Sequence, residues 1–424
     1  MIYNTFQFEL NISNYYMKNI VFINHFSGVP DINERSLRHF ILSKNLIKSD
    51  YNPTIITSQN HYQSLKKDSY LHNKIITIDG VNFIFVKEKS YKKLNLLTKF
   101  LKMISFSKNL FFDFIFGKIV LKKVDIIYAS SPDLFSSLVA YYIAKRKKAK
   151  FILEIRDIWP LSQISLHKFS RNHPVILLLR FIELFLLKKS DHIISTLNNF
   201  KSYLNDNNIK TDFTYIPQVV NSHFSNKKIS INLPYGDFEK VGIYAGSVGS
   251  FYKIDKFINS FPSHLKNKIC IIIIGDGDRW NQVKELIELK NLSNIFMIHS
   301  QPRSILQNYY DIANFAISIH PTENELHKYG LSPLKVIDYM NAKLPILYIG
   351  DSSFLYDNSF KGLVESNFEE KSINQAFESI AKLPKEKMVS MGQENYSFLK
   401  TNNSIEQIQK NIEVVFERIF KNED

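Results

Sequence analysis

The sequence predicts an α/β protein made of two Rossmann-like domains that face each other across a cleft. Short, near-continuous apolar runs alternate with amphipathic segments of helical period, which is typical of parallel sheets with helices on both faces. This alternation stops in a polar stretch, residues 219–240, and then starts again. A chain of 424 residues is long enough for two domains of ordinary size.

The composition is that of a soluble globular enzyme, with 45% hydrophobic and 22% charged residues. The single cysteine, Cys270, excludes a disulfide framework and a cysteine metal cluster, so a reducing cytoplasm is the expected location. No uncharged apolar stretch reaches the ~18 residues that a bilayer span needs. The net charge of +14 does not indicate nucleic-acid binding, because only nine of the 54 basic residues are arginines and no nucleic-acid motif occurs.

The first domain is predicted to span residues 17–218, after an unstructured extension over residues 1–16 that makes Met17 the functional start. Its strands are short apolar runs, and its helices have the longer amphipathic period. The strands are expected at 20–24, 53–57, within 74–86, and at 124–130, 150–157 and 192–196, and the helices at 34–48, 134–147 and 174–189.

Residues 87–123 form a basic, aromatic-rich segment within this domain. The segment holds ten lysines against two acidic residues, interleaved with apolar runs. Such a segment suits an anionic membrane surface, but a core-facing helix with a solvated lysine face has the same pattern. Both interpretations stay open.

The second domain is predicted over residues 241–401, with 219–240 as the linker. Its strands are expected at 240–247, 268–277, 294–300, 315–321 and 345–350, and its helices at 254–264, 279–290, 303–313 and within 330–346. The tail has apolar residues at helical spacing, so a last helix within 402–424 can pack back on the first domain. Ligands bind at the carboxyl ends of the strands in such sheets, which here would border the cleft.

The stretch GLSPLKVIDYMNAKLPI, residues 330–346, predicts a helix that binds a diphosphate. A serine N-cap and a proline at the first helical position would leave free backbone N–H groups at a helix start that faces the cleft. The lysine would add a positive charge, and the aspartate three residues later would accept from ribose hydroxyls. An ordinary capped helix with a surface Lys–Asp pair is the alternative. The residues expected at the donor are Leu331, Ser332, Pro333, Lys335 and Asp338.

The turn YAGSVG, residues 244–249, follows another strand of the second domain. Gly246 and Gly249 would let the backbone approach phosphates closely. Ser247 lies between them, and Lys253 is a candidate for additional positive charge.

In order and spacing, these motifs resemble those of retaining glycosyltransferases of the GT-B fold, glycosyltransferase family 4, and within it the bacterial aminosugar transferases of O-antigen and capsule synthesis. The resemblance covers most of Met17–Phe420 and rests on residues 130–160, 244–249, 272–280 and 330–346. It implies a UDP-sugar donor, with an N-acetylated aminosugar among the candidate sugars, and retention at the anomeric carbon. We further expect a lipid-linked oligosaccharide acceptor and a peripheral position on the inner face of the cytoplasmic membrane.

The resemblance also implies that the turn Gly275-Asp276-Gly277 shapes the nucleotide pocket without a metal. Asp276 and Asp278 do have the D-x-D spacing of metal-binding glycosyltransferases of the other major fold, but here they follow a buried strand. We therefore expect no metal and no other cofactor.

The run EIRDIW places charges at the end of the buried strand 150–157, where they are costly unless paired or used. The resemblance places Asp157 near the reacting sugar, where it would accept the acceptor's proton or stabilise the transition state. Arg156 would pair with Asp157 or with the acceptor, and a purely structural ion pair is the alternative. Gly28 and Arg35, in the loop after the first strand, are candidates for acceptor or phosphate contact, although a solvated loop fits equally well.

Three positions depart from the family pattern, at Leu161, Ser247 and Gly330. Relatives often carry glutamate, arginine and glutamate there, so a non-catalytic GT-B scaffold or partner subunit is a second hypothesis. A UDP-N-acetylglucosamine 2-epimerase shares the fold, but its histidine and glutamate patterns are missing. A nicotinamide dehydrogenase is disfavoured, because no G-x-G-x-x-G follows the first strand of either domain.

Overall fold

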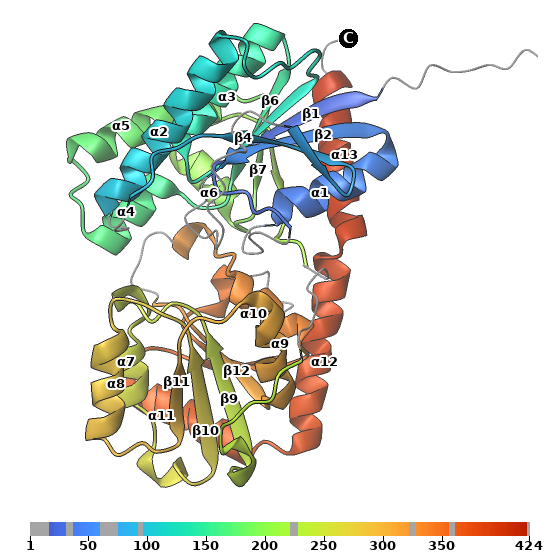
Figure 1. Cartoon of the computed structure of the whole chain (residues 1–424). Coiled ribbons are helices and arrows are strands. Elements are labelled where there is room, and N and C mark those ends of the chain that lie inside the picture. Colours follow the sequence, from blue (N-terminus) through green and yellow to red (C-terminus); the bar gives the residue numbers. More distant parts are fainter. Residues whose placement is uncertain are drawn as a thin grey trace, which may run out of the picture.

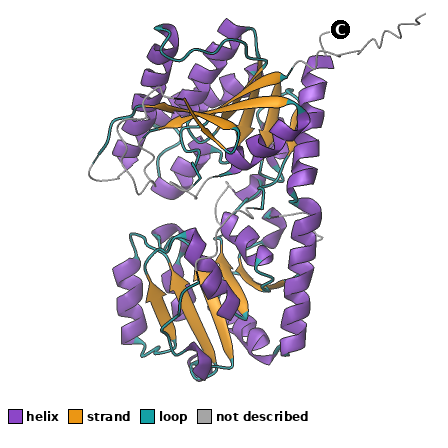
Figure 2. Cartoon of the chain, turned by 45° about the vertical axis from the view of Figure 1, so that its right-hand side comes forward, coloured by secondary structure: helices purple, strands orange, loops and turns teal. Residues whose placement is uncertain are grey.

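The computed structural model describes residues 17–30, 37–59, 75–91, 96–220, 228–321, 327–355 and 361–421. Two α/β domains lie one above the other, and a column of two helices runs along one side of both (Figures 1 and 2). The predicted extension over residues 1–16, Arg35 and the linker residues 221–227 lie outside the described residues. Among the described helices, none is both long and apolar enough to cross a bilayer.

The first domain holds an eight-stranded sheet in the order β3-β4-β2-β1-β5-β6-β7-β8, with only the β3–β4 pair antiparallel. The edge pair predicted within residues 74–86 is this hairpin, although only β3 is the true edge. The strands are β1 (Lys18–Ile23), β2 (Tyr51–Ser58), β3 (Ile75–Ile78), β4 (Val81–Val86), β5 (Ile126–Ser130), β6 (Lys150–Ile155), β7 (His192–Ser195) and β8 (Phe213–Tyr215).

Helices cover both faces of this sheet. One face packs against α2 (Leu96–Ile115), α3 (Leu134–Lys147), α4 (Trp159–His167), α5 (Pro174–Lys189) and α6 (Phe200–Asp206), and the other against α1 (Arg38–Leu46) and α13 (Ile405–Lys421). The predicted bounds of α3 and α5 match, because Asp133 caps the first helix and Pro174 opens the second. By contrast, α4, α6 and β8 were not predicted.

The second domain holds a parallel six-stranded sheet in the order β11-β10-β9-β12-β13-β14. Its strands are β9 (Lys240–Ala245), β10 (Ile269–Ile274), β11 (Ile295–Ile298), β12 (Phe315–Ile319), β13 (Ile346–Ile349) and β14 (Leu363–Ser366). Helices α7 (Ile254–Asn259), α8 (Trp280–Leu289) and α11 (Glu370–Lys382) cover one face, and α9 (Arg303–Ile312), α10 (Leu334–Asn341) and α12 (Lys385–Asn402) the other.

Two predictions for this domain need correction. The helix expected over residues 254–264 ends at Asn259, because Pro262 favours an extended conformation in the residue before it. A separate 3-10 turn, Ser263–Leu265, follows. The sequence also gave no indication of β14, α11 and α12.

The chain passes between the domains twice. After β8 it enters the linker, and it returns between α12 and α13, so that the last helix joins the core of the first domain. The two crossings meet where the Asn403 side-chain amide donates to the Gln218 carbonyl at 2.7 Å. On α13, Phe416 packs edge-on against Tyr51 of β2. The second crossing is the column visible in Figure 1.

Candidate active site

A pocket of about 490 Å³ opens at the carboxyl edge of the second sheet. It lies where the strand order reverses between β9 and β12, the usual ligand position in open α/β sheets. Six residues predicted from the sequence line it together, namely Gly246, Ser247, Gly275, Asp276, Lys335 and Asp338. These six residues come from three segments of the second domain, which converge on one cavity.

Backbone contact between two turns forms the floor of this pocket. A Cβ atom on Gly275 would lie 1.7 Å from the Gly246 carbonyl oxygen, and one on Gly277 would lie 2.2 Å from that of Val248. Hydrogen bonds join the turns, from the Gly246 N–H to the Ile274 carbonyl at 2.9 Å and from the Val248 N–H to the Asp276 carbonyl at 3.0 Å. Only glycine allows this approach, so Gly277 shapes the pocket without lining it.

Helix α10 begins one residue later than predicted. Pro333 is extended, with ψ 119°, and takes the N-cap position, so Ser332 does not cap the helix with its side chain. The cause lies before the helix, where the proline favours an extended Ser332 and the Leu331 N–H is bound to the Phe354 carbonyl at 2.6 Å. No side chain caps the helix start, so its first N–H groups are left for a ligand. Leu331, Ser332 and Pro333 are not among the lining residues.

Lys335 projects from the first turn of α10 into a cage of two tyrosines. Its Nζ lies 4.7 Å from the ring centre of Tyr244 and 4.1 Å from that of Tyr252. Desolvation in this cage lowers the pKa of Lys335 to about 7. A diphosphate bound beside the ammonium would favour its charged form.

Asp338 is held by an arginine that the sequence interpretation missed. Arg303, the first residue of α9, forms an ion pair with the Asp338 carboxylate and lines the same pocket. Desolvation raises the pKa of Asp338, although the Arg303 charge opposes this effect. The pair fixes the carboxylate in the pocket wall, where it can accept from hydroxyls.

The Asp276 carboxylate is engaged by protein groups of the next loop. It lies 2.6 Å from His299 Nδ1 and accepts a hydrogen bond from the Ser300 N–H at 3.0 Å. The pKa of Asp276 is lowered, mainly by the hydrogen bond from the Ser300 hydroxyl. The His299 ring in turn stacks on Trp280 at 4.2 Å. Asp276 therefore holds the loop after β11 against the pocket. Among the described residues, no group of three His, Cys, Asp or Glu side chains could hold a metal ion.

Lys253 does not line the pocket. It follows the 3-10 turn Ser250–Tyr252 in a left-handed conformation, with φ 49°, and its Nζ lies 5.9 Å from the ring centre of Phe368.

In the first domain, Asp157 follows β6. Its carboxylate accepts from the Ser162 hydroxyl, and burial raises its pKa. The pKa of Tyr252 is also raised, first by its own burial and then by the charge of Asp157. Tyr252 is one of the two tyrosines that cage Lys335. The candidate base of the first domain thus lies close enough for its charge to act on a tyrosine beside Lys335.

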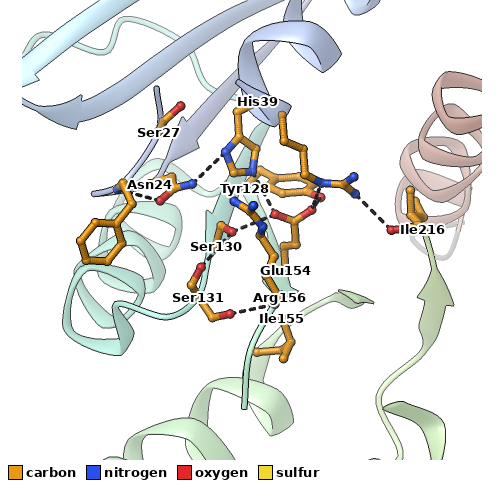
Figure 3. Close-up of polar contacts among 12 residues, drawn as sticks. Asn24, Ser27, His39, Tyr128, Ser130, Ser131, Glu154, Ile155, Arg156 and Ile216 are labelled. Carbon is orange, nitrogen blue, oxygen red and sulfur yellow. Dashed lines mark hydrogen bonds and ion pairs between the residues drawn. The ribbon is translucent and has the colours of Figure 1, made fainter. Parts of the chain in front are cut away.

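Arg156 lies beside a buried cluster around Glu154, which is shown in Figure 3. The Glu154 carboxylate accepts from Arg38 Nε at 2.8 Å, His39 Nε2 at 3.0 Å, the Tyr128 hydroxyl at 2.9 Å and the Ser130 hydroxyl at 2.8 Å. The pKa of Glu154 lies well below its usual value, because the charges of Arg38 and Arg156 and the hydrogen bond from His39 outweigh its burial. Four side chains thus donate to Glu154, an arrangement that was not predicted from the sequence.

Two further contacts define this cluster. Burial lowers the pKa of His39, so the neutral ring donates from Nε2 to Glu154 and accepts at Nδ1 from the Asn24 amide at 2.9 Å. The Arg38 guanidinium donates to the Ile216 and Pro217 carbonyls at 3.2 and 2.6 Å. The end of β8, where the chain leaves the first domain, is therefore anchored on Glu154.

The loop after β1 is fixed by a second buried charge cluster. Gly28 is buried there, and His25 lies 2.9 Å from Asp133 and 2.5 Å from Glu88. Burial by itself would lower the pKa of His25, but the two carboxylates raise it to about 9. Lys102 pairs with Glu88 at 2.9 Å. These residues come from distant segments, so no local sequence signal indicated them.

Gly330 lies at the boundary between the domains. It has φ +104°, and a Cβ atom there would lie 2.2 Å from Asn198 Oδ1 of the first domain. Nearby, the Asn199 amide donates to the Lys328 carbonyl at 2.7 Å, and Lys328 pairs with Asp206 at 2.7 Å. A glutamate at position 330 would not fit, because Asn198 occupies the space of its side chain.

Comparison with protein-family models gives no match, and comparison with curated proteins gives none. Solved structures do match the chain. Sucrose-phosphate synthase from Thermosynechococcus elongatus aligns with TM-score 0.70 and 13% identity, covering 96% of this chain and 100% of that one. WaaG, a glycosyltransferase involved in lipopolysaccharide biosynthesis, gives 0.61 and 12%, covering 94% and 99%. Anabaena HepE in complex with UDP and glucose gives 0.60 and 10%, covering 95% and 100%. The chain therefore has the two-domain GT-B fold of glycosyltransferases.

Proposed function

We propose that the protein is a glycosyltransferase with a UDP-sugar donor. The observation that carries this proposal is the pocket in which the uncapped start of α10, Lys335 and the Arg303–Asp338 pair converge. Backbone N–H groups and a lysine suit a diphosphate, and a fixed carboxylate suits ribose hydroxyls. The similarity to HepE, whose structure holds UDP and glucose, supports the choice of donor.

The transfer step follows from the position of Asp157. Its raised pKa and its place near Tyr252 suit a group that takes the acceptor's proton or stabilises the developing positive charge of the sugar. The leaving diphosphate, held by Lys335, would assist on the same face of the sugar. The reaction would retain the anomeric configuration without a covalent intermediate and without a metal.

We further propose that the acceptor is a lipid-linked oligosaccharide of O-antigen or capsule synthesis, and that the donor sugar is an N-acetylated aminosugar. The involvement of WaaG in lipopolysaccharide biosynthesis agrees with such an acceptor. The enzyme would lie peripherally on the inner face of the cytoplasmic membrane.

Helix α2 supports this location, because it is apolar on two sides. Met103, Phe106 and Leu110 are buried in the core. On the other side Leu97, Leu101, Ile104, Phe112 and Ile115 are exposed, at 36 to 65%. A solvated lysine face would not explain this exposed apolar stripe, whereas insertion into a lipid surface would.

Calorimetric titration with UDP, GDP and ADP, with and without EDTA, tests the donor assignment. We expect UDP to bind in preference to the others and its affinity to be independent of EDTA. Preference for another nucleotide would change the donor class. Binding of none, with the protein folded, would favour the scaffold hypothesis.

Asp157→Asn tests the assignment of the base. We expect UDP affinity to stay unchanged and release of UDP from the donor, in the presence of extracted membrane lipid, to fall by about a hundredfold or more. Asp237→Asn, at an exposed carboxylate, is the matched control. Unchanged turnover in the Asp157 variant would remove this residue from the mechanism.

A further inference from the structure

Two further helices of the first domain, α3 and α5, expose large apolar side chains as α2 does. On α5, Leu177, Leu178 and Phe181 are exposed at 51, 49 and 70%. Their positions i, i+1 and i+4 place them on one face of the helix. Helix α3 adds Leu138, which is exposed at 37%. Single exposed apolar residues are normal on a protein surface, but a group of them on neighbouring helices indicates a binding surface.

Helix α3 packs against both α2 and α5 on one face of the first sheet. The ring centres of Phe111 on α2 and Tyr142 on α3 lie 5.3 Å apart. Those of Tyr141 on α3 and Phe185 on α5 lie 5.4 Å apart. Figure 1 shows these helices on the side of the domain opposite α13. We call the exposed apolar side chains of α2, α3 and α5 together the three-helix face.

The exposed charges on these helices all have one sign. The structure describes every residue of the three helices, and their acidic side chains, Asp113 and Glu183, are both buried. Every exposed charged residue on them is basic, and these residues include Lys99, Lys108, Lys145, Arg146, Lys188 and Lys189. The helices of the second domain differ, since α8 exposes Glu285 and Glu288, and α12 exposes Glu386.

The helix dipole alone does not account for this pattern. The partial negative charge at the end of a helix favours cations in its last turn, which explains the two lysines at the end of α5. Lys99, however, stands in the first turn of α2, where the dipole disfavours a cation. Lys108 lies between Ile104 and Phe112 at intervals of four residues, so it belongs to the exposed apolar stripe of α2. Basic residues therefore occur within the three-helix face as well as at its ends.

We propose that the three-helix face binds a membrane that contains anionic lipid, with α3 and α5 inserting beside α2. This inference rests on the proposed membrane location, and it adds a second inserting helix and a requirement for negative headgroups. Exposed apolar side chains flanked by basic ones suit a helix that lies in an anionic lipid surface. A second copy of the chain fits less well, because two such faces would bring like charges together.

The test compares double variants of the full chain, each of which replaces two exposed apolar side chains by glutamine. Leu177→Gln with Phe181→Gln alters α5, and Leu97→Gln with Ile104→Gln alters α2. Sedimentation with phosphatidylcholine vesicles, with and without phosphatidylglycerol, measures the affinity of each variant for lipid. Because all four side chains are exposed, the variants should keep the thermal stability and the UDP affinity of the natural chain.

Leu289→Gln with Val389→Gln is the matched control. These side chains are exposed at 81 and 63%, but they lie on α8 and α12 of the second domain. We expect the control variant to bind vesicles as the natural chain does. The α5 variant should lose about twentyfold or more in affinity for vesicles with phosphatidylglycerol, since each half-exposed large apolar side chain is worth roughly fivefold when it enters lipid. Without phosphatidylglycerol, the natural chain should bind more than about tenfold more weakly.

The outcomes separate this inference from the proposed function. If the α2 variant loses affinity and the α5 variant does not, the membrane location stands and the three-helix face is refuted. If the natural chain binds neither kind of vesicle, the membrane location and this inference fail together, while UDP binding still decides the donor assignment. If the natural chain is a dimer that the α5 variant dissociates, as measured by light scattering, α5 binds a second copy and the inference is overturned.

A fluorescent label on α5 gives a direct measure of insertion. Phe181→Cys can be labelled selectively, because the natural cysteine, Cys270, is buried. A fluorophore that emits at shorter wavelength in an apolar environment should shift to the blue on addition of vesicles with phosphatidylglycerol. The same label at Leu289→Cys should not shift. Equal behaviour of the two labels would show that α5 does not enter the lipid.

Discussion

The two domains use the polar groups near the ends of their strands differently. In the second domain, glycine turns and an uncapped helix start leave donors and charges around an open pocket. In the first domain, side chains from distant segments turn inward and satisfy one another around Glu154 and His25. One edge is prepared for a ligand, whereas much of the polar chemistry of the other edge holds the fold in place. Asp157 is a predicted residue of the first domain whose charge acts on Tyr252 of the second.

Glu154→Gln should have the largest effect, and this effect should be confined to the stability of the first domain. The amide would leave the buried Arg38 guanidinium without its carboxylate, which costs about 3–5 kcal/mol in the free energy of unfolding. Denaturant unfolding should show this loss, while UDP affinity stays unchanged at temperatures where the variant is folded. Glu239→Gln, at an exposed position, is the control. Unchanged stability would mean that the cluster does not hold the first domain together.

Gly275→Ala should affect the pocket of the second domain. The new methyl group would lie 1.7 Å from the Gly246 carbonyl oxygen, so the two turns must move apart, at a cost of about 2–3 kcal/mol in stability. We expect UDP affinity to fall along with stability. Gly236→Ala is the matched control, since no atom lies within 4 Å of the Cβ there. Normal UDP binding by a folded Gly275 variant would show that this turn does not shape the donor site.

Lys335→Met should affect ligand binding more than folding. It removes a charged contact to the diphosphate, worth about 2–3 kcal/mol, so calorimetry should show roughly a 30- to 150-fold loss of UDP affinity. Thermal stability should not fall, because the variant no longer desolvates an amine. Lys343→Met, just after the other end of α10, is the control. Equal UDP affinity in the two variants would refute the assignment of the helix.

The smallest expected effect is the pH dependence of UDP binding. Burial lowers the pKa of Lys335 to about 7, so the free protein loses this charge as the pH rises through 7. A bound diphosphate favours the ammonium, and affinity should fall by up to about tenfold per pH unit above pH 7. The Lys335→Met profile should lack this fall. The stability of the free protein depends on pH in the opposite direction from its UDP affinity. The unfolded chain binds more protons between about pH 7 and its pKa of 10.5, so stability rises with pH across that window.

The difference between the two domains also explains which features could be predicted from the sequence. The residues that line the pocket at the start of α10 could be predicted because the two glycine turns and the helix start are local sequence patterns. The Arg303–Asp338 pair was missed because its partners are 35 residues apart and meet only when α9 and α10 pack side by side. His25, Glu88 and Asp133 were missed for the same reason. The prediction that Ser332 caps α10 was wrong. Serine is a favourable N-cap residue, but the proline that follows it favours an extended conformation at Ser332.

Because the last helix of the chain packs on the first domain, this domain is completed late during synthesis. Helix α13 covers the sheet face that Ile20, Phe22 and Ile55 help to form. About 190 residues separate the end of β8 from the start of α13, and at roughly 5–20 residues per second the ribosome needs about 10 to 40 seconds to make them. For that time an apolar sheet face lacks its final covering. A nascent chain stalled within the second domain would therefore be a natural client for a chaperone, although most of its first domain has already emerged.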